Sequence, residues 1–240
     1  MLGVIHMSAF ELIIFDCDGV LVDSERITNQ VFCTMLNELG LPLSLQDMFE
    51  HFVGLSMPQC VQLITEMHGQ PPPSTFVDEL RQRAASALKE QITPIPGVKE
   101  ALAGLGLPCC VASSGDHEKI RLTLSATGLL TRFEGRIFSV VDVARPKPAP
   151  EVFLFAARQL GVLPAACAVI EDTPTGVRAA VAAGMRTFGF AANTPAHRLK
   201  EAGAHYLFWD MAELVELLNS AQPFHAADSH QRPSSAGSCR

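Results

Sequence analysis

The chain lacks the features that mark nucleic-acid-binding and membrane proteins. It has no run of lysine and arginine, and its net charge is -7, whereas non-specific binding to nucleic acid or anionic membranes needs the opposite balance. No stretch approaches the ~20 consecutive apolar residues that a membrane-spanning helix requires. We therefore expect no nucleic acid and no membrane among its partners.

The cysteines lack the spacing of a metal site or a redox motif. No CxxC pair is present, no histidine stands at zinc-ligand spacing, and the number of cysteines, seven, is odd. Most lie in apolar stretches, where a reduced cysteine behaves as a small hydrophobic residue. The N-terminal MLGVIHM is too short for a secretory signal and lacks its basic start, so we expect a cytoplasmic protein. The cysteines are Cys17, Cys33, Cys60, Cys109, Cys110, Cys167 and Cys239.

The composition is that of an ordinary soluble globular enzyme. Hydrophobic residues make up 48% of the chain and charged residues 18%, which argues against a disordered protein. A length of 240 residues allows one large domain, or a core domain with a smaller insertion. The segment 221–240 is polar, aperiodic and rich in proline, serine and alanine, and we expect it to be disordered.

A short apolar run forms the first predicted strand. ELIIF, residues 11–15, ends abruptly at Asp16, which is typical of a buried parallel strand. From Ser24 onward the apolar residues recur with the period of an amphipathic helix. Because no convincing strand follows until after residue 91, we expect an all-helical insertion. Its helical patterns begin at Ser24 and continue at about 45–53, 57–68 and 74–91.

Strand and helix patterns then alternate, which predicts a parallel sheet with helices on both faces. The expected fold class is α/β, a doubly wound parallel sheet with an inserted all-helical cap domain. The core domain would comprise residues 8–22 and 95–220, and the cap residues 23–94. The later strands are predicted from PCCVA, IFSVV, ACAVI, MRTFGF and HYLFW.

Polar side chains stand at the end of strand after strand. Asp16, Ser113 and Asp142 each follow or close an apolar run, and Glu171-Asp172 follows another. Because the carboxyl ends of parallel strands line one crevice, we expect these distant residues to converge there. The crevice is the predicted ligand site.

Carboxylates in this crevice favour a hard divalent cation. Asp16, Glu171 and Asp172 could ligate Mg²⁺ through oxygen, and the backbone carbonyl of Asp18 could join them. Such an ion would also offset the repulsion between Asp16 and Asp18. Paired aspartates are, however, also common in turns and helix caps.

Small and cationic residues near the same strand ends favour a phosphate. Gly19 and Gly115 would let backbone N–H groups approach an anion, and Ser113 could donate from its hydroxyl. In the simpler alternative, Ser113 and Ser114 only cap the following helix. Lys147 lies between prolines in RPKPAP, an extended and stiff mount that could direct its ammonium into the crevice.

Four segments occur in a fixed order at the predicted strand ends: FDCDGVLVDSE, VASSG, RPKPAPEVF and VIEDTPTGVRAAVAAGM. With them the chain resembles the haloacid dehalogenase-like hydrolase superfamily over roughly residues 10–220. It is most similar to the branch of beta-phosphoglucomutases and sugar-phosphate phosphatases, including 6-phosphogluconate phosphatase-type members. The resemblance implies a doubly wound core with a helical cap inserted after the first strand.

The resemblance also implies a role for each matched residue. Asp16 would be the nucleophile that becomes an aspartyl-phosphate. Asp18 would protonate the leaving oxygen and then activate water. The implied ligands are Ser113 and Lys147 for the phosphoryl group, and Asp16, Asp18, Glu171 and Asp172 for Mg²⁺.

Two departures from the mutases favour hydrolysis. The mutases resembled here have a histidine in the first cap helix, where this chain has Thr28, and an arginine where Met57 follows Gly54-Leu55-Ser56. We therefore expect a Mg²⁺-dependent phosphatase of a small sugar or sugar-acid phosphate, as a monomer or weak homodimer. A phosphomutase and a non-catalytic binding protein remain alternatives. The polar cap residues that could contact substrate are Thr28, Asn29, His51, Gln59, Arg81 and Arg83.

Overall fold

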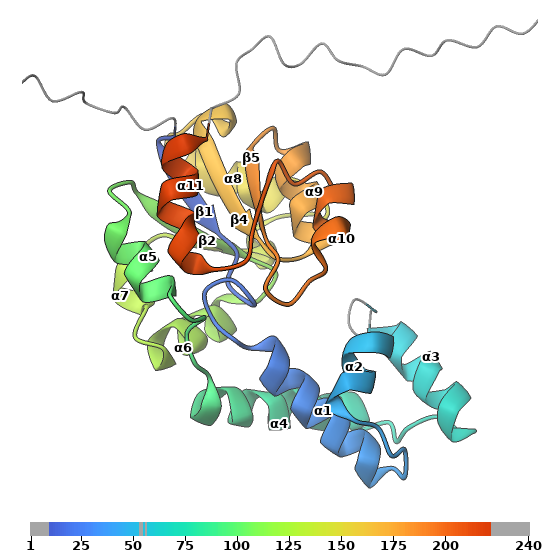
Figure 1. Ribbon diagram of the computed structural model, residues 1–240. Helices are drawn as coiled ribbons and strands as arrows, with labels where there is room; N and C mark the ends of the chain where they lie inside the picture. Colours follow the sequence, from blue (N-terminus) through green and yellow to red (C-terminus); the bar gives the residue numbers. More distant parts are fainter. Residues whose placement is uncertain (1–9, 53–54, 56, 222–240) are drawn as a thin grey trace, which may run out of the picture.

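A parallel six-stranded sheet forms the core, in the order β3-β2-β1-β4-β5-β6 (Figure 1). The computed structural model describes residues 10–52, 55 and 57–221. The strands are β1 (Leu12–Phe15), β2 (Cys109–Ser113), β3 (Ile137–Ser139), β4 (Cys167–Glu171), β5 (Arg186–Phe190) and β6 (Tyr206–Phe208).

β1 lies at the centre of this sheet because the chain turns to opposite sides of it. Phe15 pairs with Val111 of β2 on one side and with Ile170 of β4 on the other. The strand order therefore reverses at β1, and ligands of open α/β sheets bind at such a reversal. Asp16 follows β1 directly at this point.

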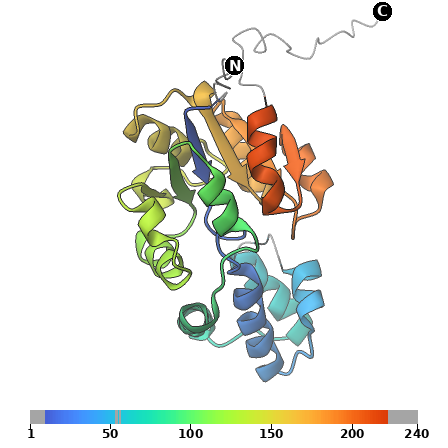
Figure 2. The ribbon, with the colours of Figure 1, turned by 60° about the vertical axis from the view of Figure 1, so that its left-hand side comes forward.

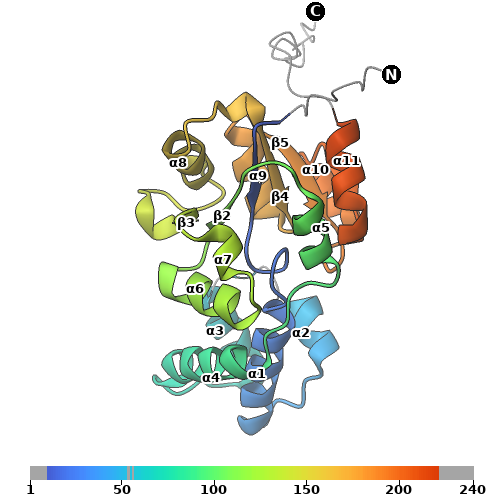
Figure 3. The same ribbon diagram turned by 90° about the vertical axis from the view of Figure 1, so that its left-hand side faces the viewer.

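Helices cover both faces of the sheet, as Figures 1 and 3 show. The expected doubly wound α/β class is confirmed. The α-helices are α1 (Glu25–Glu38), α2 (Leu45–His51), α3 (Met57–His68), α4 (Phe76–Gln91), α5 (Val98–Gly104), α6 (His117–Ala126), α7 (Leu130–Phe133), α8 (Glu151–Gln159), α9 (Pro174–Ala182), α10 (Ala196–Glu201) and α11 (Leu214–Ser220). Short 3-10 helices are η1 (Val140–Asp142), η2 (Pro164–Ala166) and η3 (Met211–Glu213).

The uninterrupted apolar run of β1 matches burial on both sides. Ile13 and Phe15 belong to one hydrophobic cluster, whereas Leu12 and Ile14 belong to a second. The first cluster includes side chains of α5, α6 and α11, and the second includes side chains of α8 and α9. Successive side chains of a strand point to opposite faces of the sheet. In a strand that helices cover on both faces, every side chain is therefore buried and apolar.

The helices α1 to α4 form the insertion between β1 and α5, and they lie beyond the carboxyl ends of the strands (Figure 2). They have a hydrophobic cluster of their own, which includes Phe32, Leu36 and Ile64. At the end of the insertion, Leu88 and Ile92 pack instead in a cluster of the sheet. The limits of the cap, residues 23–94, remain a prediction.

The strand predicted from IFSVV is shorter than expected. It ends at Ser139, because the Ser139 hydroxyl accepts a hydrogen bond from the Val141 backbone N–H at 3.2 Å. Asp142 closes the turn by accepting from the Ser139 N–H at 2.9 Å. Local capping thus replaces the strand with a 3-10 turn.

The chain ends require one correction. Ala221 was expected to begin a disordered tail, but it is buried in the core at 3% exposure. Residues 8, 9 and 222–240 lie outside the described part of the chain. In that described part, no helix is both long and apolar enough to cross a membrane.

Candidate functional site

The carboxyl ends of the three central strands bring four polar residues together. Asp16 follows β1, Ser113 ends β2, and Glu171 ends β4 and is followed by Asp172. All four are buried, although each has a polar or charged side chain. Buried polar groups are costly unless something compensates them, so their neighbours define what the site can do.

Lys147 joins two of these residues, Asp16 and Glu171. Its Nζ donates to Asp16 Oδ1 at 2.6 Å, to Glu171 Oε1 at 2.8 Å and to the Ala112 carbonyl at 3.0 Å. An ammonium has three donors, so all of them are used. Burial opposes the charge, but the two carboxylates outweigh it and raise the pKa of Lys147 above its usual value. Lys147 is therefore a fixed cation.

Glu171 is held by the protein at both carboxylate oxygens. Oε1 accepts from Lys147, and Oε2 accepts from the Thr173 backbone N–H at 3.0 Å and from the Thr173 hydroxyl at 2.9 Å. A Cβ at position 176 would lie 1.7 Å from Oε1, so only Gly176 fits there. These contacts make Glu171 an anchor for Lys147, and both of its oxygens already accept hydrogen bonds from the protein. Its role as a Mg²⁺ ligand stays a prediction.

Asp172 has the opposite environment. Its side chain is buried at 1% exposure, and neither Oδ1 nor Oδ2 has a hydrogen-bond partner among the described residues. Burial, and then the charges of Glu171 and Asp16, raise the pKa of Asp172 well above its usual value. Gly19, at a φ of 80°, leaves the space, because a Cβ there would lie 2.1 Å from Oδ2. An unpartnered carboxylate beside a second one fits a hard cation such as Mg²⁺.

Asp16 responds to the same crowding. In the protein without a bound metal ion, burial raises the pKa of Asp16 to about 7. The charge of Lys147 opposes this rise, and the charges of Glu171 and Asp18 add to it. A cation bound beside Asp16 would lower that pKa again and favour the carboxylate. Asp16 and Asp172 are thus the side chains that could hold a metal ion, with the Asp18 carbonyl as a further predicted ligand.

Asp18 points to other partners than Asp16 does. Its Oδ1 accepts from the Ser24 hydroxyl at 2.5 Å, and its Oδ2 accepts from Lys119 Nζ at 2.8 Å. Burial alone would lower the pKa of Lys119, but Asp18 outweighs it and raises that pKa. The two aspartates of the DxD motif therefore have separate cations, Lys147 and Lys119.

The sequence did not single out Lys119. Its place follows from Asp116, the N-cap of α6, whose Oδ1 accepts from the Lys119 backbone N–H at 2.8 Å. An N-cap three residues before a lysine, just after a strand end, was a readable signal. Because lysines in a first helical turn are usually solvated, this signal alone does not distinguish Lys119 from a surface residue.

The same cap corrects the simpler interpretation of the two serines. Asp116 caps α6, so neither Ser113 nor Ser114 has that role. The buried Ser113 hydroxyl instead accepts from the Gly115 N–H at 3.1 Å, which shapes the loop. Its own hydrogen can still be donated to an anion. Ser114 is exposed.

In the described part of the chain, Thr28 and Lys119 line two cavities between the core and the insertion. The larger, about 480 Å³, runs from Thr28 and Lys119 to Arg81 on α4. The smaller, about 330 Å³, is lined by Asp18, Thr28 and Lys119 and by apolar insertion residues. The Thr28 hydroxyl donates to the Ser24 carbonyl at 2.9 Å. Space for a small molecule thus begins beside Asp18.

The other polar cap candidates differ in position. Asn29 lines the smaller cavity. Arg83 pairs with Glu38 at 2.7 Å on the exposed surface of the insertion and lines neither cavity. Gly54 and Ser56, which entered the comparison with mutases, lie outside the described residues.

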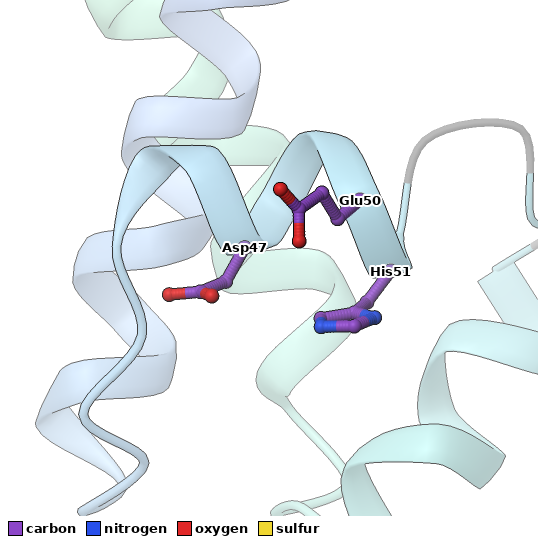
Figure 4. A group of neighbouring side chains, drawn as sticks. All are labelled: Asp47, Glu50 and His51. Atoms are coloured by element: carbon purple, nitrogen blue, oxygen red, sulfur yellow. The ribbon is translucent and has the colours of Figure 1, made fainter.

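Asp47, Glu50 and His51 form a second acidic group, on α2 (Figure 4). Asp47 Oδ2 accepts from the Ser44 N–H at 2.7 Å and from its hydroxyl at 2.6 Å, which lowers the pKa of Asp47. Glu50 accepts from Gln46 at 2.8 Å. Helix capping accounts for Asp47 and the bond from Gln46 accounts for Glu50, and His51 lines neither of the two cavities.

Replacing Lys147 tests its place at the centre of the site. In Lys147→Met, Asp16 and Glu171 lose their shared cation, and breaking a buried ion pair costs about 3–5 kcal/mol. The free energy of unfolding without metal, measured in urea at pH 7, should fall by that amount. The loss should shrink at pH 5, where Asp16, with its pKa of about 7, takes up a proton. Lys200→Met, at an exposed site on α10, is the control, and equal losses in both variants would contradict the role of Lys147.

Comparisons with known proteins identify the family of the chain. Residues 13–190 match the family model described as haloacid dehalogenase-like hydrolase. The chain is 30% identical to 6-phosphogluconate phosphatase of Escherichia coli (strain K12) over 188 residues, which are 78% of this chain and 85% of that protein. Among solved structures, a conserved haloacid dehalogenase-like protein from Agrobacterium tumefaciens has a TM-score of 0.82 at 36% identity, covering 87% of this chain and 97% of its own.

A hydrolase of the same family from Deinococcus radiodurans, solved with bound phosphate and sodium, has a TM-score of 0.78 at 34% identity, covering 87% of this chain and 94% of its own. The match to the family model spans most of the chain. The expected resemblance is thereby confirmed: the chain belongs to the haloacid dehalogenase-like hydrolases, in their branch of sugar-phosphate phosphatases.

Proposed function

We propose that the protein is a Mg²⁺-dependent phosphatase that hydrolyses a small phosphorylated metabolite, a sugar or sugar-acid phosphate, through an aspartyl-phosphate. The observation that carries this proposal is Asp16, which Lys147 holds beside the unpartnered carboxylate of Asp172. The 6-phosphogluconate phosphatase relative and the phosphate bound to the Deinococcus protein support it.

The two displacements at phosphorus would use the two aspartates in turn. Asp16 attacks phosphorus, the bond to the ester oxygen breaks, and Asp18 gives that oxygen a proton. Asp18 then takes a proton from water, whose oxygen attacks the same phosphorus and releases inorganic phosphate from Asp16. The Ser113 hydroxyl would donate to the phosphoryl oxygens, and the fixed positive charge of Lys147 beside Asp16 would offset their negative charge.

The cation would act on charge. When bound by Asp16 and Asp172, Mg²⁺ supplies neutralisation of the phosphoryl oxygens and keeps Asp16 ionised. Glu171 keeps Lys147 directed at Asp16 through its fixed oxygens. Two positive charges would therefore act on the phosphoryl group, that of the exchangeable Mg²⁺ and that of Lys147.

Thr28 supports hydrolysis over transfer to a second hydroxyl. It lies beside Asp18 along the smaller cavity, where the mutases that the chain resembles have a histidine. The Thr28 hydroxyl donates to the Ser24 carbonyl. Threonine has no imidazole that could accept a proton from a second substrate hydroxyl. We therefore expect water, rather than a second substrate hydroxyl, to accept the phosphoryl group.

The proposal is tested by phosphate release from a panel of phosphorylated sugars, sugar acids and nucleotides, with Mg²⁺ or with a chelator. Release that needs the metal supports a phosphatase. Interconversion of hexose phosphates without release would instead show a mutase, and no reaction on the panel would favour a non-catalytic protein.

Asp18→Asn should slow turnover by about 10²–10⁴-fold, the usual contribution of one acid–base group. Binding of Mg²⁺ should change little, because the Asp18 carboxylate is bonded to Ser24 and Lys119 rather than directed at Asp172. Steady-state rates and the Mg²⁺-dependent shift in melting temperature measure the two effects. Asp210→Asn, at a helix cap on the core, is the matched control, and a variant with full activity would rule out the role of Asp18.

Mg²⁺ should stabilise the protein more at pH 8 than at pH 5.5. The pKa values of Asp16 and Asp172 are raised in the folded protein, so without metal these groups favour folding at low pH and stability falls as the pH rises toward 7. Protons and Mg²⁺ compete for the same oxygens. At 100 times its dissociation constant the ion should add about 2.7 kcal/mol.

Thermal melts with and without Mg²⁺ measure this stabilisation. Asp172→Asn should remove most of it, and Asp78→Asn, at an exposed position on α4, should not. Equal stabilisation of both variants would exclude Asp172 as a ligand.

A further inference from the structure

Lys119 lies where the two cavities meet. It lines both of them, as does Thr28, and its side chain is 39% exposed. Its Nζ is 2.8 Å from Asp18 Oδ2. A cation that touches the general acid and also faces open space is placed to meet the part of a substrate that lies outside the phosphoryl site.

The two lysines of the site differ in what they have left to offer. Lys147 donates all three of its hydrogens to Asp16, Glu171 and Ala112. Lys119 makes one side-chain hydrogen bond within the described part of the chain, to Asp18. An ammonium has three donors, so Lys119 can bind a further oxygen without breaking a buried network.

Distance places the leaving group within reach of Lys119. A proton donor must lie about 2.6–3.2 Å from the oxygen that it protonates. Asp18 therefore has to approach the ester oxygen, and Lys119 is one hydrogen bond beyond Asp18. The carbon chain that leaves the ester oxygen toward the cavities must pass this ammonium.

The charges around the cavities decide which anion fits. Their lining contains two cations, Lys119 and Arg81, and also the carboxylates of Glu25, Asp116 and Glu118 besides Asp18. Arg81 is already paired with Asp78 at 3.1 Å. A second phosphate group would bring up to two charges into this acidic lining, whereas a carboxylate brings one. Lys119 can balance that one charge in the step in which its partner Asp18 carries the proton for the leaving oxygen.

We propose that Lys119 binds a carboxylate of the leaving group, so that the preferred substrates are phosphorylated sugar acids. This inference rests on the proposed phosphatase function and narrows it. The substrate carboxylate takes up donors of Lys119 that now face the cavities, and the carbon chain between the ester oxygen and the carboxylate lies along the cavities that Lys119 lines.

Two six-carbon esters that differ at one carbon provide the test. Gluconate 6-phosphate carries a carboxylate where glucitol 6-phosphate carries a hydroxymethyl group. A hydrogen bond to a charged group contributes about 1.5–3 kcal/mol, so kcat/KM of the wild type should favour the acid by roughly 10–100-fold. In Lys119→Gln this ratio should fall to about one, and in Lys119→Arg, which keeps the charge, most of it should remain.

The ratio is taken within each variant, so a general loss of activity does not affect it. Lys200→Gln, at an exposed site on α10, is the control and should keep the ratio of the wild type. Equal use of both esters by the wild type, an unchanged ratio in Lys119→Gln, or a preference for a hexose bisphosphate over the acid would each overturn the inference. If the wild type released phosphate from no ester on the panel, the proposed function itself would fail, which is a different result.

Discussion

The ion pairs of Lys147 are the constraint on which the site depends. Three carboxylates, Asp16, Glu171 and Asp172, are buried at the ends of two neighbouring strands, and Lys147 supplies one positive charge to two of them. Isolated charges are expensive to bury, so the remaining negative charge needs a further cation or protons. The raised pKa values of Asp16 and Asp172 express that need in the protein without metal. In a site of this kind, all three carboxylates can stay ionised only when a further bound cation balances their charge.

The fold makes this crowding possible. Parallel pairing of β1 with β4 sets Asp16 beside the end of β4, and the Asp16 N–H donates to the Ile170 carbonyl at 3.0 Å. Gly19 and Gly176 then leave room where any Cβ would collide with a carboxylate. Hydrophobic clusters on both faces of the sheet hold these strand ends in place. The energy that stabilises the apolar core thereby offsets the cost of assembling like charges at its edge.

The sheet, the insertion and the place of the site could be predicted from the sequence. Apolar runs that end at a polar residue are local signals, so they can be recognised without the fold. The apolar run before Asp16 and the helical pattern after Ser24 identified the sheet and the insertion. Side-chain partners were harder to predict, since the role of Asp116 as a helix cap and the contact of Lys119 with Asp18 depend on where α6 packs. For the same reason, the sequence could not distinguish the roles of Glu171 and Asp172. Glu171 is held by Thr173, whereas the Asp172 carboxylate has no hydrogen-bond partner among the described residues.

A crystal structure with Mg²⁺ and beryllium fluoride tests the central claim most directly. The account predicts continuous density from Asp16 to beryllium, with the metal ion in contact with the oxygens of Asp172 and with Lys147 still bonded to Asp16. Density for Asp16 turned away from the fluoride, with no ion at Asp172, would contradict the account.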